Sequence, residues 1–559
     1  MSNQARYLYR YEAKSIQRYV LASDRLREIK GASAIVEELA GLFKRAVEAQ
    51  GHGEYRYAAA GGGTATFDSR DAADDFHAHW PMVVAQHAPG LQVVQAIVDL
   101  EAVAPASVID ALTGQLTADR SRLHIDLPEA GPIVTRAPRS GLPAVAIGDG
   151  IRTVARSQVE RRRETLFDAA AAASVTAAGG PNGDRLCDRI VMHSSLAGLR
   201  FMDDIDDLNA RYVAVVHADG NGIGGILRGV TAAARDRTTM IAELTRFSDA
   251  LKHATEQAVG DAITAALDAA QYPPGRRDGQ VFPGRPVVVG GDDMTFVLRS
   301  DLALVFVEKY LEVFERETTG MVTVPREPDR PDSPPPPYLT ACAGIAFVHQ
   351  NYPFHLAYDL AHSLCDFTKD TLRHAKLGMR SAMHFHRVTD TVTDKYGTDV
   401  LEAQLTTPEE YVLTRGPFLR RASTSHPPAP TIAGLRALAE TVADDGERAG
   451  DDRTASHDDE RGSTSVKVPR SAINDVVQHM AAGRSDLAKD RLLRLREVMV
   501  DPVRGPRSRD AWEAFETKMR ALHLDLDSGG WGEDAYGRTS TALADVLDLL
   551  PVTKRSTKR

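Results

Sequence analysis

One pattern occurs twice along this chain and limits the folds that it can adopt more than any other feature. Each copy is a strand, a helix, a glycine-centred hairpin, a second helix and a strand, first from Arg6 to Leu100 and again from Arg211 to His349. Apolar residues alternate in the strands and recur at helical spacing in the helices. A hairpin placed between crossover helices adds antiparallel pairing, so the pattern predicts an α+β fold with mixed sheets rather than a doubly wound one.

The repeat divides the 559 residues into four parts. We expect the first copy over residues 1–130, an intervening helical or linker segment over 131–205, and the second copy over 206–390. After residue 390 the apolar spacing is purely helical, which predicts an all-α C-terminal domain over 391–559. Within that domain, the acid-rich stretch 444–465 has few apolar residues and is predicted to be a disordered linker.

Charge and cysteine content narrow the class of protein. The net charge is -10, and the acidic stretch in the C-terminal part contributes much of it, so the folded remainder is closer to neutral and an RNA partner is not excluded. The three cysteines form no CxxC pair, which argues against a disulfide framework or a cysteine zinc site. No apolar run is long enough to cross a membrane and no apolar leader begins the chain. We expect a cytoplasmic protein without a membrane partner.

The two copies differ where a catalyst would need carboxylates. The second copy has Asp219 at the end of its first strand and Asp292 and Asp293 at its hairpin tip. The first copy has Gly62-Gly63-Thr64 at the hairpin, and Glu12 stands in what we take to be a different setting. Three converging carboxylates are suited to binding two Mg²⁺ or Mn²⁺ ions, which clamp the attacking and leaving oxygens in phosphoryl transfer. The residues therefore predict attack of a nucleotide hydroxyl on an α-phosphate.

A glycine run follows Asp219, with Gly220, Gly222 and Gly224 in alternate positions. Small residues at a helix start let backbone N–H groups approach a triphosphate, so we expect these glycines to contact the nucleotide. Simpler interpretations exist for each piece, since Gly-Gly-Asp-Asp makes a favourable turn and Asp219 is a suitable helix cap. Their occurrence together, at matching places in a repeated unit, favours the catalytic interpretation.

Four stretches carry a family resemblance: SIQRYVLASDRLREIKGASAIVEEL near the start, HADGNGIG around Asp219, VVGGDDMTF around Asp292, and TACAGIAFVHQNYPFHLAYDLAHSLCDFTK after them. In these stretches the chain resembles the large polymerase-cyclase subunit of type III CRISPR effector complexes. The resemblance implies two ferredoxin-like palm domains, the first degenerate and the second with the GGDD signature. It also implies ATP as substrate, 3'-5' linkages, cyclic oligoadenylate products, and other subunits and guide RNA as partners. Selectivity for adenine follows from the resemblance alone.

Roles for individual residues follow from the same resemblance. It implies that Asp219, Asp292 and Asp293 bind magnesium. It also implies that Gly290 and Gly291 shape the hairpin and that Lys369 lies near the triphosphate.

Departures from the family pattern leave alternatives open. Because the first copy begins at residue 6, we expect no HD nuclease domain. The three cysteines cannot form the family's four-cysteine zinc module, and Gly378–Ser381 stands where the family often has Gly-Lys-Asn. One alternative is a non-catalytic scaffold subunit of an RNA-guided complex. Another is a dinucleotide cyclase, because GGDD is similar to the GGDEF hairpin of a related fold. Whether the protein works inside such a complex or alone is also left open.

Overall fold

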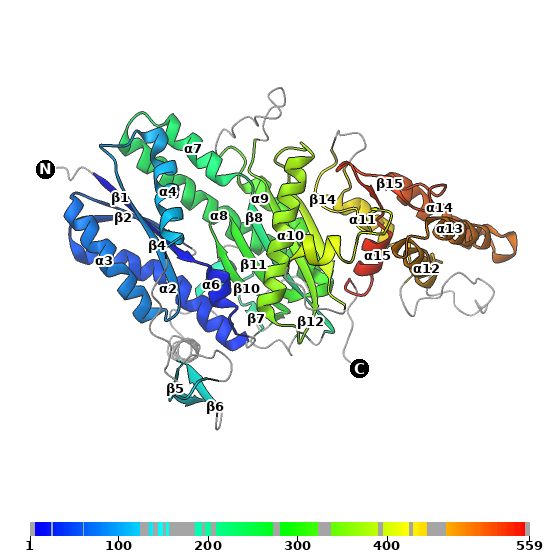
Figure 1. Ribbon diagram of the computed structural model, residues 1–559, viewed down its shortest axis with the longest axis horizontal. Coiled ribbons are helices and arrows are strands. Elements are labelled where there is room, and N and C mark those ends of the chain that lie inside the picture. Colours follow the sequence, from blue (N-terminus) through cyan, green and yellow to red (C-terminus); the bar gives the residue numbers. More distant parts are fainter. Residues whose placement is uncertain are drawn as a thin grey trace.

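Figure 1 shows a computed structural model in which the first copy of the repeat, the second copy and the C-terminal part follow one another along the long axis. We call the first copy, residues 7–120, the first module, and residues 212–387 the second module. The structure describes residues 6–23, 26–59, 61–122, 133–137, 143–148, 152–155, 185–192, 196–202, 208, 210–271, 280–321, 337–389, 395–423, 429–443 and 466–553.

The first module is a four-stranded antiparallel sheet with the strand order β2-β3-β1-β4 and helices on both faces. Its elements are β1 (Tyr7–Lys14), α1 (Ile16–Val20), α2 (Leu26–Gln50), β2 (Gly53–Ala59), β3 (Gly62–Phe67), α3 (Arg70–His87), β4 (Gln92–Asp99) and α4 (Val108–Arg120). Alternation along β1 sorts the side chains between the faces: Tyr9 and Tyr11 pack with α2 and α3, whereas Leu8 packs with α4.

The second module has a six-stranded sheet with the order β10-β11-β8-β12-β13-β14, in which the β12–β13 pair is parallel. Its elements are β8 (Tyr212–Gly220), α7 (Ile223–Ala233), α8 (Arg237–Ala269), β10 (Gly284–Gly290), β11 (Asp293–Arg299), α9 (Ala303–Glu317), β12 (Ala341–His349), α10 (Phe354–His374) and β13 (Ala382–Arg387). The edge strand β14 (Phe418–Leu419) comes from the C-terminal part. The predicted mixed α+β fold with two similar copies is confirmed.

Strand register shows how closely the copies correspond and corrects our sequence alignment of them. Each hairpin carries a bulge at the same place, between Tyr55 and Tyr57 in the first module and between Pro286 and Val288 in the second. Beyond the bulge, the last pair before the turn is Ala59 with Gly62 in the first hairpin and Gly290 with Asp293 in the second. Gly62 therefore matches Asp293, and the expected match of Gly62-Gly63-Thr64 to Gly291-Asp292-Asp293 is wrong. The run of three glycines concealed which two residues form the tip.

The same register changes the place of Glu12. In the first module Tyr11 pairs with Gly63, and in the second Ala218 pairs with Met294, so the next residues, Glu12 and Asp219, are equivalent. The expectation that Glu12 stands in a different setting is therefore wrong. The first module retains a carboxylate at the strand end and lacks only those of the hairpin.

The segment between the modules contains a hairpin that the sequence did not predict. Its described elements are β5 (Ala144–Gly148), β6 (Arg152–Ala155), α6 (Arg185–Met192) and β7 (Arg200–Phe201), and β7 pairs with β9 (Val281–Phe282). The strands β5 and β6 are too short for their alternation to stand out from the surrounding sequence.

The C-terminal part is mainly helical, as predicted, but not all-α. Its elements are the π-helical turn η4 (Tyr396–Glu402), α11 (Ile432–Ala439), α12 (Arg470–Ala481), α13 (Ser485–Val500), α14 (Pro506–Ala521), β15 (Gly532–Glu533), β16 (Thr539–Ser540) and α15 (Leu543–Leu549). Strand β14 extends the sheet of the second module, and the apolar core runs without a break from β8 into α15. Two-residue strands leave no periodic signal, which is why they were missed. The predicted linker 444–465 lies outside the described residues.

The two modules are joined by an apolar core and by a buried ion cluster. Val215 and Val287 of the second module belong to the same core as Tyr9 of the first. On α6, Arg189 forms ion pairs with Glu37 of α2, at 2.6 Å, and with Glu256 of α8, whose side chain is only 3% exposed. One guanidinium thus neutralises a carboxylate from each module at their interface.

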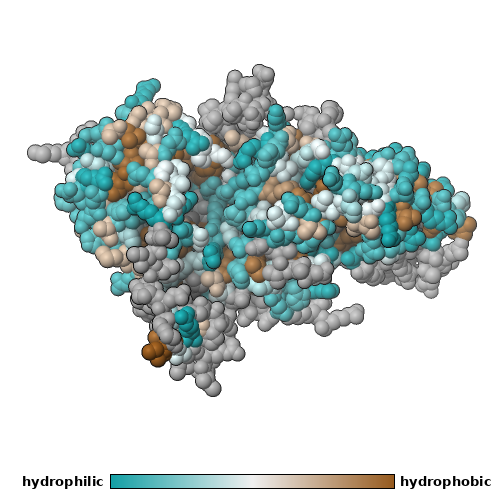
Figure 2. All heavy atoms as spheres, viewed as in Figure 1, coloured by the Kyte–Doolittle hydropathy of each residue, from teal (hydrophilic) through white to brown (hydrophobic). Residues whose placement is uncertain are grey.

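No helix among the described residues is both long and apolar enough to cross a membrane. The face of the molecule drawn in Figure 2 is mostly hydrophilic, with small apolar areas scattered over it.

Replacing Arg189 by Met should destabilise the joined modules. The change leaves Glu256 buried without its cation, which typically costs about 3 to 5 kcal/mol. We expect the free energy of unfolding, measured by urea titration with fluorescence detection, to fall by that order.

Arg246→Met is the matched control, because Arg246 pairs with Glu243 on the surface of α8 and its side chain is 63% exposed. Exposed pairs contribute about 0 to 1 kcal/mol. Equal losses in the two variants would contradict a stabilising role for the Arg189 cluster.

Candidate functional site

The predicted carboxylates meet where β8 ends beside the β10–β11 turn. This turn, which we call the GGDD hairpin, runs from Gly290 to Asp293, and Gly291 at its tip has a φ of 62°, a value that favours glycine. Asp292 packs against Gly220, where a Cβ atom would lie 2.8 Å from the Cβ of Asp292. Gly220 therefore has to be glycine so that the hairpin can approach the strand that carries Asp219.

Burial and mutual repulsion both disfavour the charged forms of the hairpin carboxylates. Burial raises the pKa of Asp292 to about 7, and the negative charge of Asp219 adds to the effect. Burial also raises the pKa of Asp293, again with help from Asp219 and Asp292. Such raised carboxyl pKa values are typical of sites that bind a cation or transfer protons.

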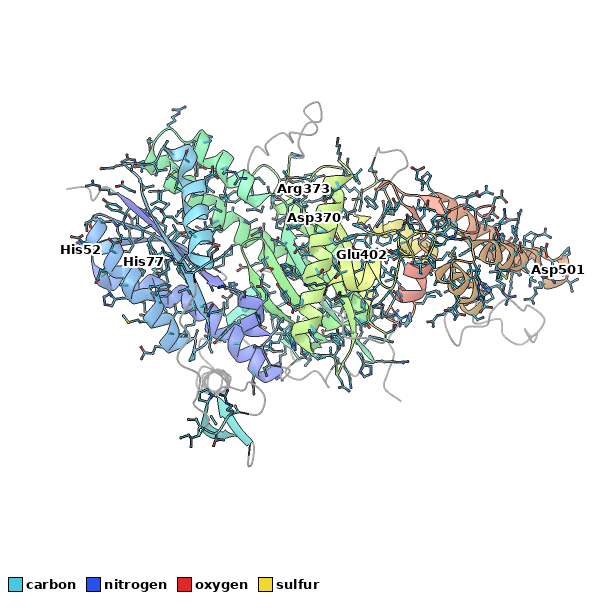
Figure 3. The ribbon with its side chains drawn as sticks, in the orientation of Figure 1. His52, His77, Asp370, Arg373, Glu402 and Asp501 are labelled. Atoms are coloured by element: carbon cyan, nitrogen blue, oxygen red, sulfur yellow. The ribbon has the colours of Figure 1, made fainter. Side chains whose placement is uncertain are left out.

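Lys369 supplies positive charge beside these carboxylates. From α10 its ammonium group contacts the Asp219 carboxylate and donates to the Gly220 carbonyl oxygen at 3.1 Å. Burial opposes the charged form, but the pull of Asp219 and its other partners prevails and the pKa of Lys369 is raised. Its neighbours Asp370 and Arg373 pair with each other on the exposed side of α10 (Figure 3). Of these three residues on α10, Lys369 is the one that the fold directs into the predicted site.

The donor set fits a divalent cation completed by substrate. Oδ1 of Asp293 is buried and accepts no hydrogen bond from any of the described residues. Among the same residues, no three acidic, histidine or cysteine side chains form a ready-made metal cage. Mg²⁺ is commonly held by one or two carboxylates together with phosphate oxygens and water, so an incomplete protein cage agrees with a metal that the carboxylates and water bind first and nucleotide phosphates then complete.

The loop after Asp219 is held by Asn221, which sequence reasoning overlooked. The Asn221 side chain donates to the Thr340 hydroxyl and to the Arg380 carbonyl oxygen, both at 3.0 Å. Gly222 has a φ of 67° and precedes α7, next to Met379. The segment that departs from the family pattern, Gly378–Ser381, therefore packs against this loop through Met379 and the Arg380 carbonyl group. Asn221 lies inside the HADGNGIG stretch, which was the available signal.

Gly224 lies in the first turn of α7 and has open space around its Cα. Unlike Gly220 and Gly222, it has neither a close neighbour nor a positive φ that requires glycine.

Two further side chains touch the hairpin: Thr255 carried no sequence signal, whereas His217 is the first residue of the HADGNGIG stretch. Thr255 of α8 donates to the Gly291 carbonyl oxygen at 2.6 Å. His217 has its Nδ1 3.4 Å from Oδ1 of Asp293, and burial, aided by His362, lowers its pKa to about 3. His217 is therefore neutral beside the carboxylates at physiological pH.

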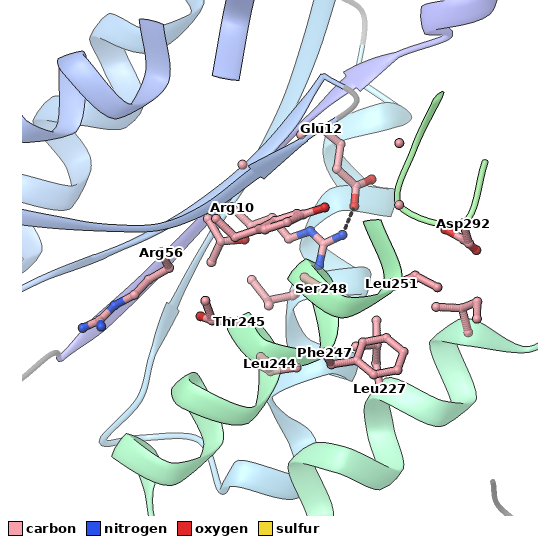
Figure 4. A pocket seen from close by; sticks show the side chains of 18 of the residues that line it. Arg10, Glu12, Arg56, Leu227, Leu244, Thr245, Phe247, Ser248, Leu251 and Asp292 are labelled. Carbon is pink, nitrogen blue, oxygen red and sulfur yellow. Dashed lines mark ion pairs between the residues drawn. The ribbon is translucent and has the colours of Figure 1, made fainter. Parts of the chain in front are cut away.

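A cavity of about 470 Å³ lies between the two modules. Asp292 and Asp293 line it, as do Arg10, Glu12 and Arg120 of the first module. Figure 4 shows Asp292 across the cavity from Arg10 and Glu12. Both arginines pair with Glu12, Arg10 at 2.8 Å. The apolar side chains that complete the lining come from α7, α8 and the region around α4, and include Ile109, Leu112, Ile223, Leu227, Leu244 and Leu251. The volume lies within the range of about 300 to 1,000 Å³ usual for small-molecule sites.

Residues 212–376 match the family model of Cas10/Cmr2, second palm domain. The match covers the second module through α10 and includes Asp219, the GGDD hairpin and Lys369. The expected resemblance to the large polymerase-cyclase subunit of type III CRISPR complexes is confirmed there. A search among curated proteins found no match to the chain.

Solved structures of the Csm1–Csm4 cassette are also similar. The complex with cA4 has 11% identity and a TM-score of 0.40, and the alignment covers 68% of this chain and 54% of that chain. The apo cassette has 13% identity and a TM-score of 0.40, with coverage of 69% and 55%. The complex with one ATP has 12% identity and a TM-score of 0.39, with coverage of 68% and 54%. This chain thus spans little more than half the length of those chains.

Replacing Asp292 by Asn should stabilise the metal-free protein at alkaline pH. The folded-state pKa of about 7 exceeds the ordinary value of 3.8, so Asp292 contributes full stability only below about pH 4 and loses it as pH rises through 7. Because Asn does not ionise, the variant should gain about 1 to 3 kcal/mol at pH 8 and little at pH 4.

Urea unfolding in EDTA at pH 4, 6 and 8 measures this difference. Asp510→Asn, at an exposed position on α14, is the control and should change stability little at any of these pH values. An Asp292→Asn variant that is less stable than wild type at pH 8 would contradict repulsion at the site.

Proposed function

We propose that this chain, which carries a Cas10/Cmr2 second palm domain, is a divalent-metal-dependent nucleotidyltransferase that makes cyclic oligoadenylates from ATP. The single observation that supports this most is the placement of Asp219 beside the GGDD hairpin, with Lys369 on Asp219 and a cavity lined by Asp292 and Asp293. Asp292 and Asp293 would bind the metal with phosphate oxygens, with Asp219 beside them. When bound, Mg²⁺ or Mn²⁺ would neutralise charge on the reacting phosphate and favour ionisation of the attacking hydroxyl.

The reaction would proceed as follows. The 3'-hydroxyl oxygen of one nucleotide forms a bond to the α-phosphorus of a second, the bond from that phosphorus to the β-phosphate oxygen breaks, pyrophosphate leaves, and the hydroxyl proton passes to water. Lys369 would place positive charge near the triphosphate. Arg10 and Arg120 would place it on the side of the first module, where a second nucleotide would have to lie.

Partners follow from the same assignment. The Csm1–Csm4 structures pair the large subunit with a second protein, and we extend this to the present chain as a proposal, with guide RNA as a further component. The cavity gives no reason to prefer a dinucleotide product to a longer ring, so the product has to be identified by its base and size.

The double substitution Asp292→Ala, Asp293→Ala should reduce product formation from ATP by about 10²- to 10³-fold or more, because the charge stabilisation of the transition state is lost. Products are resolved by chromatography and mass spectrometry after incubation with ATP and Mn²⁺ or Mg²⁺, with and without partner subunits and target RNA. Lys369→Met should also lower the rate. Arg373→Met, on the exposed side of the same helix, should not.

Two results would favour other functions. A wild-type protein that forms no product under any of these conditions, and whose melting temperature ATP with Mg²⁺ does not raise, would support the scaffold alternative, since ligands that bind the native state stabilise it. A product made from GTP rather than ATP would support the dinucleotide cyclase.

A further inference from the structure

A side chain of the first module reaches the predicted metal site of the second. Gln17, in the short helix α1, donates its side-chain N–H to Oδ2 of Asp293. With that oxygen engaged, Asp293 retains only Oδ1, the buried oxygen that accepts no hydrogen bond from any of the described residues. The hydrogen bond therefore leaves Oδ1, which has the neutral His217 Nδ1 at 3.4 Å, as the oxygen that remains for a cation.

The backbone before Gln17 adopts a strained conformation that places it there. Ser15 has a φ of 53° and a ψ of 52°, in the left-handed region that residues other than glycine rarely occupy. From Glu12 to the start of α1 the chain has the same length as from Asp219 to the start of α7, so Ser15 is equivalent to Gly222. The first module thus has serine in a left-handed conformation that the second module gives to glycine. Backbone strain of this kind clusters at functional sites.

The same equivalence exposes an asymmetry between the modules. Gln17, the second residue of α1, corresponds to Gly224, the second residue of α7. Asp293 corresponds to Gly62 of the first module. The first module, which has no carboxylate at its hairpin, therefore has the hydrogen-bond donor Gln17 where the second module has glycine. Gln17 contacts the hairpin carboxylate of the second module, Asp293.

Other contacts of the first module and α6 also hold this hairpin, but on its backbone. The Ser33 hydroxyl of α2 donates to the Val287 carbonyl oxygen at 2.7 Å, at the bulge of β10. Arg189 donates to the Val289 carbonyl oxygen at 3.3 Å. Gln17 differs from both because its partner is a predicted metal ligand rather than the main chain.

We propose that Gln17 is a positioning residue that orients the Asp293 carboxylate for the divalent cation, so that the degenerate module completes the metal site of the other. The inference rests on the proposed function. Groups that orient a metal ligand typically change metal affinity by about 10- to 100-fold when removed.

The test measures Mn²⁺ binding to the full chain by electron paramagnetic resonance, with no nucleotide present. Gln17→Met keeps the length of the side chain and removes the donor, and should weaken binding by about 10- to 100-fold. Gln17→Asn keeps the amide but is one methylene too short to reach Asp293, and should weaken binding similarly. Gln50→Met is the matched control, because the Gln50 amide donates to the Ala72 carbonyl oxygen within the first module, and it should bind Mn²⁺ like wild type.

The outcomes separate this inference from the proposed function. If Asp292→Ala abolishes Mn²⁺ binding and both Gln17 variants bind as wild type does, the positioning role is overturned and the metal site stands. If the Gln17 variants lose affinity while wild type makes no nucleotide product, the positioning role stands and the proposed activity fails. Melting temperatures in EDTA should be equal for Gln17→Asn and wild type. A much lower melting temperature of the variant would show that Gln17 stabilises the fold rather than positions Asp293, and would overturn the inference.

Discussion

Repulsion among Asp219, Asp292 and Asp293 is the constraint on which the arrangement of the second module depends. Three carboxylates near one strand edge resist burial, and the pKa values of Asp292 and Asp293 are raised as a result. The fold nevertheless holds them together, by pairing β11 with β8, by leaving Gly220 without a side chain and by directing Lys369 inward. This repulsion is what a divalent cation with its nucleotide would relieve.

Among the described residues, the two modules share a backbone but differ in the carboxylates that the proposed site needs. The modules share strand register, a bulge and the turn into the following helix, so their backbones are alike while their side chains have diverged. In the first module Glu12 is paired with arginines, where Asp219 of the second is paired with Lys369. A carboxylate neutralised by guanidinium groups has less need of a metal. The cavity between the modules is consequently lined by both cationic and acidic side chains.

Much of the fold was predictable because its signals are local. Alternating strands, amphipathic helices and the GGDD turn each leave a pattern within a few residues, and the copies were recognisable by their order. Hairpin register was not, because Gly61-Gly62-Gly63 permits more than one tip and a bulge shifts the count. The short strands β5, β6, β14, β15 and β16 lack enough residues to show a period. The core shared by β8 and α15 joins residues too far apart in sequence for any local pattern to reveal.

The candidate site divides in the same way. The sequence by itself determined the residue types, three carboxylates and the glycines around them, because the chemistry of phosphate and hard cations restricts what can serve. The lysine was expected from the family resemblance alone. Only the tertiary structure decided which groups act on them. Gln17, Thr255 and His217 reach the hairpin from three separate elements, and Arg189 joins the modules behind it. Such contacts depend on how the modules pack, and packing is set by the sum of many buried surfaces, which no motif records.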